Sequence, residues 1–140
     1  MKLYVDGSCL GNGLVKPAPG GWAALNPDTL ERWSGYGLDS TNQQAELQAI
    51  ALAVEVAPPG IELHIYTDSA FSIAAIMGRI KIQDKLLKPI LVRCWQLAEE
   101  KDIKPVLHKN KGKRSRPAIA VDMLAKQASK YAQNLLREKI

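Results

Sequence analysis

Two short segments of the chain share one pattern, in which a tyrosine and an aspartate are separated by one residue and followed by a small one. They are Tyr4–Gly7 (YVDG) and Tyr66–Ser69 (YTDS). Because side chains alternate between the two faces of a strand, the tyrosine and the aspartate of each segment share a face. If the two strands are neighbours in matched phase, Asp6 and Asp68 lie side by side as a pair of carboxylates.

Two further acids are candidates for the same site. Glu46 is followed at helical spacing by Ala49, Ile50 and Ala53, so it lies at the edge of an apolar helix face. Asp122 comes early in the last predicted helix, where the helix dipole favours an anion. Burying several ionised carboxylates together is costly and raises their pKa values, and a divalent cation removes that conflict. Acids without accompanying histidine or cysteine suit hard ions such as Mg²⁺ or Mn²⁺ and not zinc.

Each acid also has an ordinary structural interpretation. Asp6 could cap its own glycine turn, and Asp68 could cap the helix that follows it. Glu46 could be a solvated surface acid, and Asp122 could pair with Lys126 four residues later on the same helix. The metal-site hypothesis therefore depends on the four acids acting together.

The elements that must position these acids follow from hydrophobic periodicity and turn residues. Thr41 and Gln44 form a capping box at the start of one helix, and Pro58-Pro59-Gly60 ends it. Pro89 marks the first turn or a kink of another helix. Strands are predicted at residues 2–5, 22–26, 31–36, 61–67 and 104–108, and helices at residues 42–57, 69–77, 83–101 and 117–138.

This order of elements favours an α/β fold with one mixed sheet covered by helices on both faces. A right-handed crossover can place the fourth strand parallel to the first and beside it. Both aspartates then stand at the carboxyl ends of strands, where open α/β sheets build their sites. Trp22, Trp33 and Trp95 are expected to be core or partly buried aromatics, and Met123 and Leu124 core residues.

The charge of the chain is unevenly distributed. Residues 1–70 carry three Lys or Arg against eight Asp or Glu, a net −5, whereas residues 71–140 carry sixteen against six, a net +10. An acidic centre beside a basic surface suits a polyanion substrate handled through bound cations, although unevenly solvated surface charge is the alternative. The basic stretch next to Asp122 would give salt-dependent phosphate affinity, or else is a solvated loop; it contains Lys109, Lys111, Lys113, Arg114 and Arg116.

Length and cysteine usage narrow the class of protein. At 140 residues the chain is most simply one domain. Cys9 and Cys94 make neither a disulfide framework nor a metal-site spacing. There is no apolar run of transmembrane length and no opening that reads as a signal peptide. We expect a monomer in a reducing compartment, the cytoplasm, without membrane contact.

Five segments in order, YVDGSCLGN, PAPGGWAAL, TNQQAEL, YTDS and VDMLAKQA, resemble the type 1 ribonucleases H. The resemblance implies a ribonuclease H-like fold with strand order 3-2-1-4-5 and one catalytic domain over residues 1–140. It implies an endonuclease that hydrolyses the RNA strand of RNA/DNA hybrids and leaves 5′-phosphate and 3′-hydroxyl ends. The short region from Gly78 to Lys104 looks like the minimal archaeal and bacterial forms that lack a basic protrusion.

The resemblance also implies roles for individual residues. Asp6, Glu46, Asp68 and Asp122 would be the catalytic carboxylates that bind two Mg²⁺ ions, for which Mn²⁺ can substitute. Thr41 occupies the position at which relatives grip a DNA phosphate. Other positions that touch the hybrid in relatives are Cys9, Gly11, Asn12, Gln43 and Gln44.

The chain departs from the family pattern before Asp122. The position of the loop histidine that assists proton transfer or product release in many relatives is Gly112 here, and a frequent asparagine is Ala118. His108, fourteen residues before Asp122, is a candidate for that auxiliary role, against a structural or exposed histidine; a basic loop side chain could also substitute. The alternatives to a ribonuclease H are another nuclease of this fold, such as a junction resolvase or an integrase-like domain, and a hybrid-binding module with weak catalysis.

Overall fold

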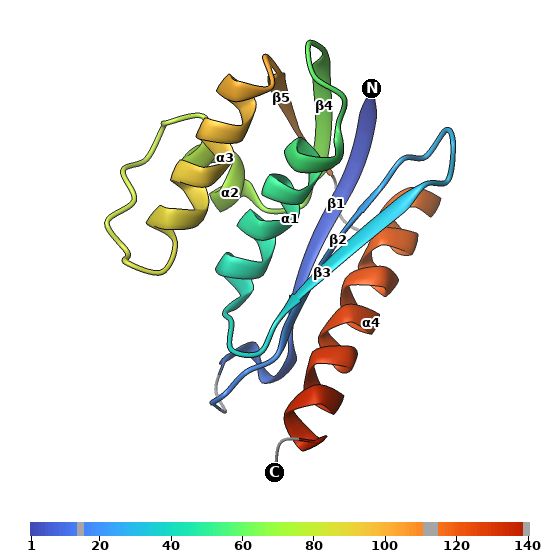
Figure 1. The fold of residues 1–140 in the computed structure, drawn as a ribbon, viewed down its shortest axis with the longest axis vertical. Helices are drawn as coiled ribbons and strands as arrows, with labels where there is room; N and C mark the ends of the chain where they lie inside the picture. Colours follow the sequence, from blue (N-terminus) through green and yellow to red (C-terminus); the bar gives the residue numbers. More distant parts are fainter. Residues whose placement is uncertain (14–15, 111–114, 139–140) are drawn as a thin grey trace.

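A five-stranded mixed sheet forms the middle layer of the computed structural model, which describes residues 1–13, 16–110 and 115–138 (Figure 1). The sheet has the order β3-β2-β1-β4-β5, and the predicted order 3-2-1-4-5 is confirmed. β1 pairs antiparallel with β2, and β2 with β3, whereas β1, β4 and β5 run parallel. The strands are β1 (Lys2–Cys9), β2 (Gly20–Leu25), β3 (Arg32–Gly37), β4 (Glu62–Thr67) and β5 (Lys104–Lys109).

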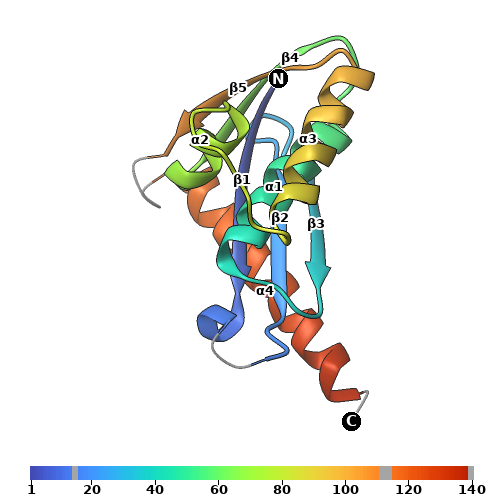
Figure 2. The ribbon, with the colours of Figure 1, turned by 90° about the vertical axis from the view of Figure 1, so that its left-hand side faces the viewer.

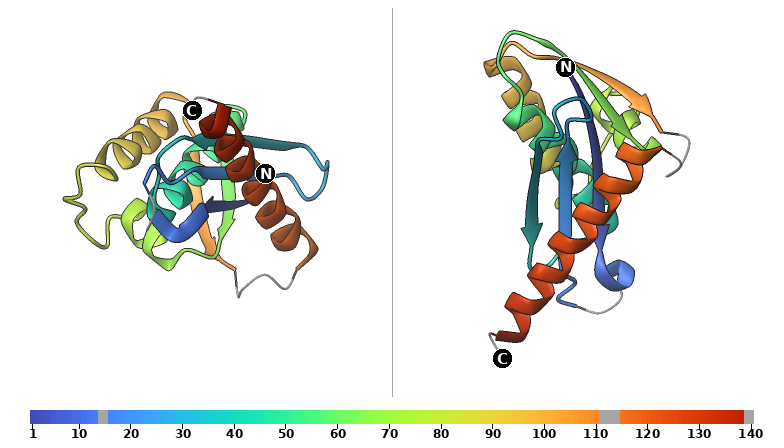
Figure 3. Two further views of the ribbon diagram at one scale, coloured as in Figure 1. Left: turned by 90° about the horizontal axis from the view of Figure 1, so that it is seen from below. Right: turned by 90° about the vertical axis from the view of Figure 1, so that its right-hand side faces the viewer.

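Helices cover both faces of the sheet, as predicted. On one face α1 packs on β1 and β2, and α3 packs on α1; on the other face α4 crosses β1, β2 and β3. Figure 3 shows α4 in front of these strands with α1 and α3 behind them, and Figure 2 shows α2 beside the ends of β4 and β5. The helices are α1 (Asn42–Val56), α2 (Ala70–Ile76), α3 (Lys88–Glu100) and α4 (Arg116–Glu138), with a short 3-10 helix η1 (Leu10–Gly13) after β1.

The alternation along β1 separates two hydrophobic cores. Leu3 and Val5 face α1 and belong to the larger core, to which β4 contributes Leu63 and Ile65. Tyr4 faces the other way and packs against the smaller core under α4. Asp6 has the same phase as Tyr4, so it opens onto the α4 side of the sheet, where α4 leaves the stretch over β4 and β5 partly uncovered.

The sequence misjudged the end of β1. The strand was predicted to end at Val5 in a glycine turn, but it continues through Gly7 to Cys9, because its pairing with β2 runs on to Cys9 opposite Gly20. Asp6 therefore lies inside a strand and not at its carboxyl end. The pairing of β1 with β4, by contrast, stops at Tyr4. Asp6 therefore lies two residues beyond the last residue of β1 that pairs with β4.

The predicted start of α3 was also wrong, because the helix was predicted from residue 83 and begins five residues later. Asp84 accepts hydrogen bonds from the backbone N–H groups of Leu86 (2.7 Å) and Leu87 (3.2 Å), which holds residues 84–87 in a turn. The helix begins only at Lys88, and Pro89 stands in its first turn, where a missing N–H costs nothing. Of the two interpretations of that proline, the first turn is confirmed.

Two expected core residues are exposed. Met123 lies on the outer side of α4, beside the buried stripe that includes Val121 and Ala125. Trp95 lies on the side of α3 that faces the end of α2 and is 45% exposed, whereas Trp22 and Trp33 are partly buried, as predicted. No helix within the described ranges has the length and apolar character to span a bilayer.

Candidate active site

Three of the four predicted carboxylates meet in one place. Asp6 comes from β1, Glu46 from α1, and Asp68 from the residue that follows β4. One oxygen from each of the three lies within 4.8 Å of the other two. Asp6 is buried and the other two are half-buried. We refer to Asp6, Glu46 and Asp68 as the carboxylate cluster.

The register of β1 and β4 places the two aspartates in matched phase. Tyr4 is directly opposite Tyr66 in the parallel pairing, and their rings stack with centroids 4.7 Å apart and planes 11° apart. Because side chains alternate, Asp6 and Asp68, each two residues further on, emerge on the same face. The paired Tyr-x-Asp segments are therefore side by side, as the sequence predicted.

Gly7 brings the third carboxylate to this pair. A Cβ at Gly7 would lie 2.5 Å from the backbone nitrogen of Glu46 and would also collide with Ala45, so α1 rests directly on the strand. The Thr41 hydroxyl accepts from the Gln44 backbone N–H at 3.1 Å, which fixes the start of the helix. The predicted N-cap is confirmed, and the two contacts together set the height of Glu46 over β1.

Glu46 has an ionisable carboxyl group at a position that disfavours its charged form. Burial, followed by the negative charges of Asp6 and Asp68, raises its pKa from 4.5 to about 9. Its Oε2 atom is buried and has no hydrogen-bond donor in the described part of the protein. A divalent cation among the three oxygens would supply the missing positive charge, and a purely carboxylate donor set fits a hard ion. The residues present therefore fit Mg²⁺ or Mn²⁺.

Asp68 is not needed as a helix cap. Ser69 is the N-cap of α2, and its hydroxyl accepts from the Ser72 backbone N–H at 3.1 Å. The Thr67 hydroxyl in turn accepts from the Ser69 N–H at 3.1 Å. Ser69, and not Asp68, therefore caps α2, and the Asp68 side chain belongs to the carboxylate cluster.

Asp122 stands apart from the three. It lies in the second turn of α4, not in the first, and its Oδ2 is 3.1 Å from Lys126 Nζ, the pairing that its helical spacing indicated. Its side chain is only 13% exposed. It borders a hollow of about 370 Å³ that also touches Gly7, the residue after Asp6. Its role as a fourth carboxylate stays a prediction.

The same hollow contains several predicted substrate positions and some that the sequence did not suggest. Cys9 and Gly11 line it, with the Cys9 thiol turned towards the Ser40 carbonyl at 3.4 Å. The sequence missed Asn42, Lys126 and Lys130. The two lysines lie four and eight residues after Asp122, so helical spacing could have placed them on its face.

The remaining predicted substrate residues are distributed around the cluster or lie outside the description. Thr41 and Gln44 are half-buried at the start of α1, and Gln43 is exposed there. Lys109 is exposed and pairs across the sheet with Thr67, next to Asp68, and Arg116 is exposed at the start of α4. Four predicted residues lie outside the described residues or have side chains that do: Asn12, Lys111, Lys113 and Arg114.

His108 is held in the sheet. Its ring stacks on Tyr66 with centroids 4.6 Å apart, and its Nε2 lies 2.8 Å from His64 Nδ1. His64 Nε2 lies 2.8 Å from Glu62 Oε1, which completes a chain of three side chains, called here the histidine chain. His108 is half-buried in this arrangement, one strand away from Asp68, so of its ordinary interpretations the structural one fits.

Comparison with known proteins agrees with the geometry. Residues 1–130 match the family model described as RNase H. Ribonuclease HI of Rickettsia conorii is 41% identical over 71 residues, which are 49% of this chain and 44% of that protein. Ribonuclease H of Agrobacterium fabrum is 32% identical over 111 residues, which are 76% of this chain and 66% of that protein. The match to this chain thus spans less than half the length of the Rickettsia relative.

Solved structures share the fold. The RNase H1 of the halophilic archaeon Halobacterium salinarum superposes with a TM-score of 0.72 at 23% identity, over 91% of this chain and 95% of that one. LC11-RNase H1, solved in complex with an RNA/DNA hybrid, superposes with a TM-score of 0.70 at 21% identity, over 94% and 98% of the two chains. At these identities the likeness concerns the architecture.

Proposed function

Because the chain belongs to the RNase H family, we propose that it is a metal-dependent endonuclease that hydrolyses the RNA strand of RNA/DNA hybrids. The carboxylate cluster is the observation that carries the proposal. Three acids from β1, α1 and the end of β4 converge within 4.8 Å, at the positions where the sequence resembles the family's carboxylates. Bringing three acids this close raises the pKa of Glu46 to about 9, a cost that a site serving the fold alone has no reason to bear.

In this proposal Asp6, Glu46 and Asp68 hold two Mg²⁺ ions against the scissile phosphate, and Mn²⁺ can take their place. Ions held by these carboxylates would activate a water molecule and offset the charge on the departing 3′-oxygen, and cleavage of this kind would leave 5′-phosphate and 3′-hydroxyl ends. Asp6 stays anchored because its Oδ1 accepts from the Gly7 N–H at 2.9 Å. Asp122 joins as the fourth carboxylate by exchanging its contact with Lys126 for one with a cation.

The basic residues around the hollow would bind the hybrid's phosphates. Lys126 and Lys130 line it, and Lys109 and Arg116 stand at the two ends of the stretch that joins β5 to α4. The hollow is bordered by Cys9 at the end of β1, by Gly11 in η1 and by Asn42 at the start of α1. These residues would contact one strand of the hybrid. Affinity of this kind falls steeply with added salt. Discrimination for RNA on the cleaved strand would come from contacts with its 2′-hydroxyl groups.

The test is cleavage of an end-labelled RNA/DNA hybrid by the purified protein with Mg²⁺, Mn²⁺ or a chelator. Double-stranded RNA and a four-way DNA junction serve as matched substrates. We expect cleavage of the hybrid alone and only with a metal ion. Preferential cleavage of the junction would favour the resolvase alternative, and tight hybrid binding without metal-dependent turnover would favour the binding-module alternative.

A further inference from the structure

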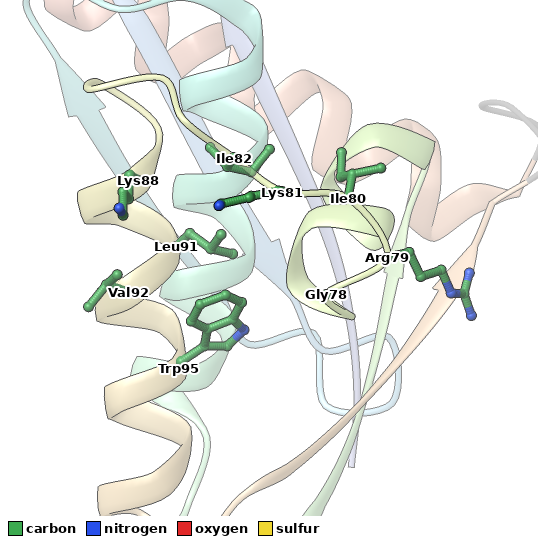
Figure 4. Close-up of a pocket in the computed structure, with 9 residues that line it drawn as sticks. All are labelled: Gly78, Arg79, Ile80, Lys81, Ile82, Lys88, Leu91, Val92 and Trp95. Carbon is green, nitrogen blue, oxygen red and sulfur yellow. The ribbon is translucent and has the colours of Figure 1, made fainter.

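A hollow with an apolar floor and a basic rim lies between α3 and the loop that follows α2. Figure 4 shows side chains of α3 facing those of the loop across it, and its volume is about 500 Å³. Leu91, Val92 and Trp95 contribute from the helix, and Ile80 and Ile82 from the loop. We call it the α3 hollow.

Trp95 is a fixed wall of the α3 hollow. Its indole Nε1 donates to the carbonyl oxygen of Ile76, the last residue of α2, at 3.0 Å. This bond ties the ring to α2, yet the residue remains 45% exposed. An aromatic ring that is anchored and still half in water offers a rigid apolar surface at little entropic cost to a ligand.

Three exposed apolar residues lie in the segment of the chain that contains the loop side of the α3 hollow. Met77 is 49% exposed, Ile80 40% and Leu86 59%, and all three lie in the loop region that begins at the end of α2. Single exposed apolar residues are ordinary, but Ile80 lines the hollow and the other two belong to the same short segment, which indicates a binding surface. None of these residues belongs to the carboxylate cluster or to the predicted hybrid contacts.

The rim of the α3 hollow is positively charged. Residues 78–96 contain five Lys or Arg and one Asp. Arg79, Lys81 and Lys88 line the hollow, the Arg79 guanidinium pointing away from α3 (Figure 4), and no acidic residue of the described chain lines it. Asp84, the one acid of the segment, is occupied with the backbone N–H groups of the turn before α3.

A second hollow, of about 660 Å³, lies beside the first and extends the surface along α3. It shares Lys88 and Val92 with the α3 hollow, and its described lining adds Lys85 and Arg93, of which Arg93 is paired with Glu55 at 3.0 Å. Together the two hollows offer room for several residues of an extended or helical segment. A ligand that fits must combine bulky apolar groups with negative charge.

We propose that the α3 hollow docks an acidic peptide segment of a partner protein, with a bulky apolar side chain inserted against Trp95. Charge complementarity selects the acidic partner, because Lys81 and Lys88 stand on the rim and no acid of the described chain lines the hollow. Apart from Trp95 the apolar lining is aliphatic, with Ile80, Ile82, Leu91 and Val92, which argues against nucleic acid because its bases are held by successive aromatic rings. A second copy of the chain is disfavoured because each copy has a net charge of +5. The proposal does not rest on the nuclease function.

The experiment follows the indole N–H resonance of Trp95 by NMR in the full chain, with Trp95→Phe used for assignment. The probe is a synthetic peptide in which aspartate alternates with leucine and phenylalanine. Its comparison peptides have lysine in place of aspartate, or serine in place of the apolar residues, and a single-stranded DNA oligonucleotide is titrated in parallel. We expect saturable shifts of Trp95 with the acidic apolar peptide alone.

Variants locate the binding. Reversing two rim charges, Lys81→Glu with Lys88→Glu, should weaken the acidic peptide by about tenfold or more, since two weak attractions become repulsions. Val92→Ser should weaken it by removing part of the floor. Arg32→Glu, an exposed charge reversal on the edge strand β3, is the matched control and should leave binding unchanged.

Several results would overturn the proposal. These are no saturable shift with the acidic apolar peptide, equal binding of the lysine peptide, or binding that survives the double charge reversal. Stronger binding of the oligonucleotide, lost in the same double variant, would assign the hollow to nucleic acid. Sedimentation that changes with concentration and is abolished by Lys88→Glu would assign it to a second copy. The Asp6→Asn variant should bind the peptide normally, so the failure of either proposal can be recognised separately.

Discussion

Two groups of polar side chains lie close together in the fold, and they are built on opposite principles: the histidine chain on β4 and β5, and the carboxylate cluster on β1, α1 and the residue after β4. In the histidine chain each side chain meets a partner, with Glu62 Oε1 and His64 Nε2 at 2.8 Å and His64 Nδ1 and His108 Nε2 at 2.8 Å. In the carboxylate cluster three acids bring oxygens within 4.8 Å of one another, and Glu46 Oε2 is buried without a donor in the described chain.

The difference teaches which of the two groups awaits a ligand. A polar group whose members satisfy one another is complete in the folded chain and stabilises it. A group of like charges raises the free energy of the folded chain unless something from outside compensates it. The histidine chain is therefore expected to serve the structure, and the carboxylate cluster to bind cations.

The largest expected effect is that of Asp6→Asn on cleavage. The substitution keeps the size of the side chain and removes a negative charge from the centre of the cluster. Loss of metal-based stabilisation worth several kcal/mol should lower turnover on the hybrid by about a thousandfold or more. Hybrid binding, measured in parallel by fluorescence anisotropy, should largely survive. Ordinary turnover in this variant, with chelated controls inactive, would remove the cluster from the mechanism.

Gly7→Ala tests how the cluster is assembled. The added Cβ would lie 2.5 Å from the Glu46 nitrogen, so α1 must shift and carry Glu46 away from Asp6. We expect turnover to fall by more than about tenfold and stability by about 1–3 kcal/mol, the usual cost of overpacking. Gly37→Ala is the matched control, because a Cβ there meets only Trp22, at 3.4 Å and beyond. Equal activity of the two variants would contradict this account of how Glu46 is positioned.

The stability of the metal-free protein should depend on pH through Glu46. Its pKa is raised from 4.5 to about 9, so between these values the folded state holds a proton that the unfolded state has lost. The contribution of Glu46 to stability is therefore full below about pH 4.5 and is lost progressively as the pH rises towards 9. Urea unfolding in chelator at several pH values measures it.

Glu46→Gln sharpens the same measurement. Without an ionisable group at position 46 the decline should flatten, and the variant should be more stable than the parent protein at neutral pH in chelator. Added Mg²⁺ should stabilise the parent protein more than the variant, by linkage to binding. A variant that is destabilised and keeps the steep decline would mean that another group titrates.

His64→Ala should have the smallest effect on cleavage. It removes the middle of the histidine chain, at a cost of about 0.5–1.5 kcal/mol in stability for the lost hydrogen bonds. Turnover on the hybrid should change by less than about threefold, and Glu62→Gln, which keeps an acceptor, should cost less stability still. A loss of activity as deep as that of Asp6→Asn would erase the distinction between the two groups and make His108 a functional residue.

Much of the fold could be predicted because its signals are local. Thr41 caps α1 as its side chain and spacing indicated, and the alternation of Leu63 and Ile65 identified β4. The repeated Tyr-x-Asp pattern placed Asp6 and Asp68 together, since strand alternation needs no distant information. The turn before α3 was missed because Asp84 competes with the helix through its own side chain, a choice that periodicity does not report.

The sequence by itself determined which acids could form a site, the phase of the two aspartates and the charge of the surface around them. Only the tertiary structure decided that Gly7 is extended and not a turn, because the pairing of β1 with β2 continues past it and α1, which is far away in the chain, lies against it. It also decided that Glu46 joins the two aspartates, while Asp122 pairs with Lys126. Distances between segments remote in the chain are fixed by packing, and a pattern of residue types does not contain them.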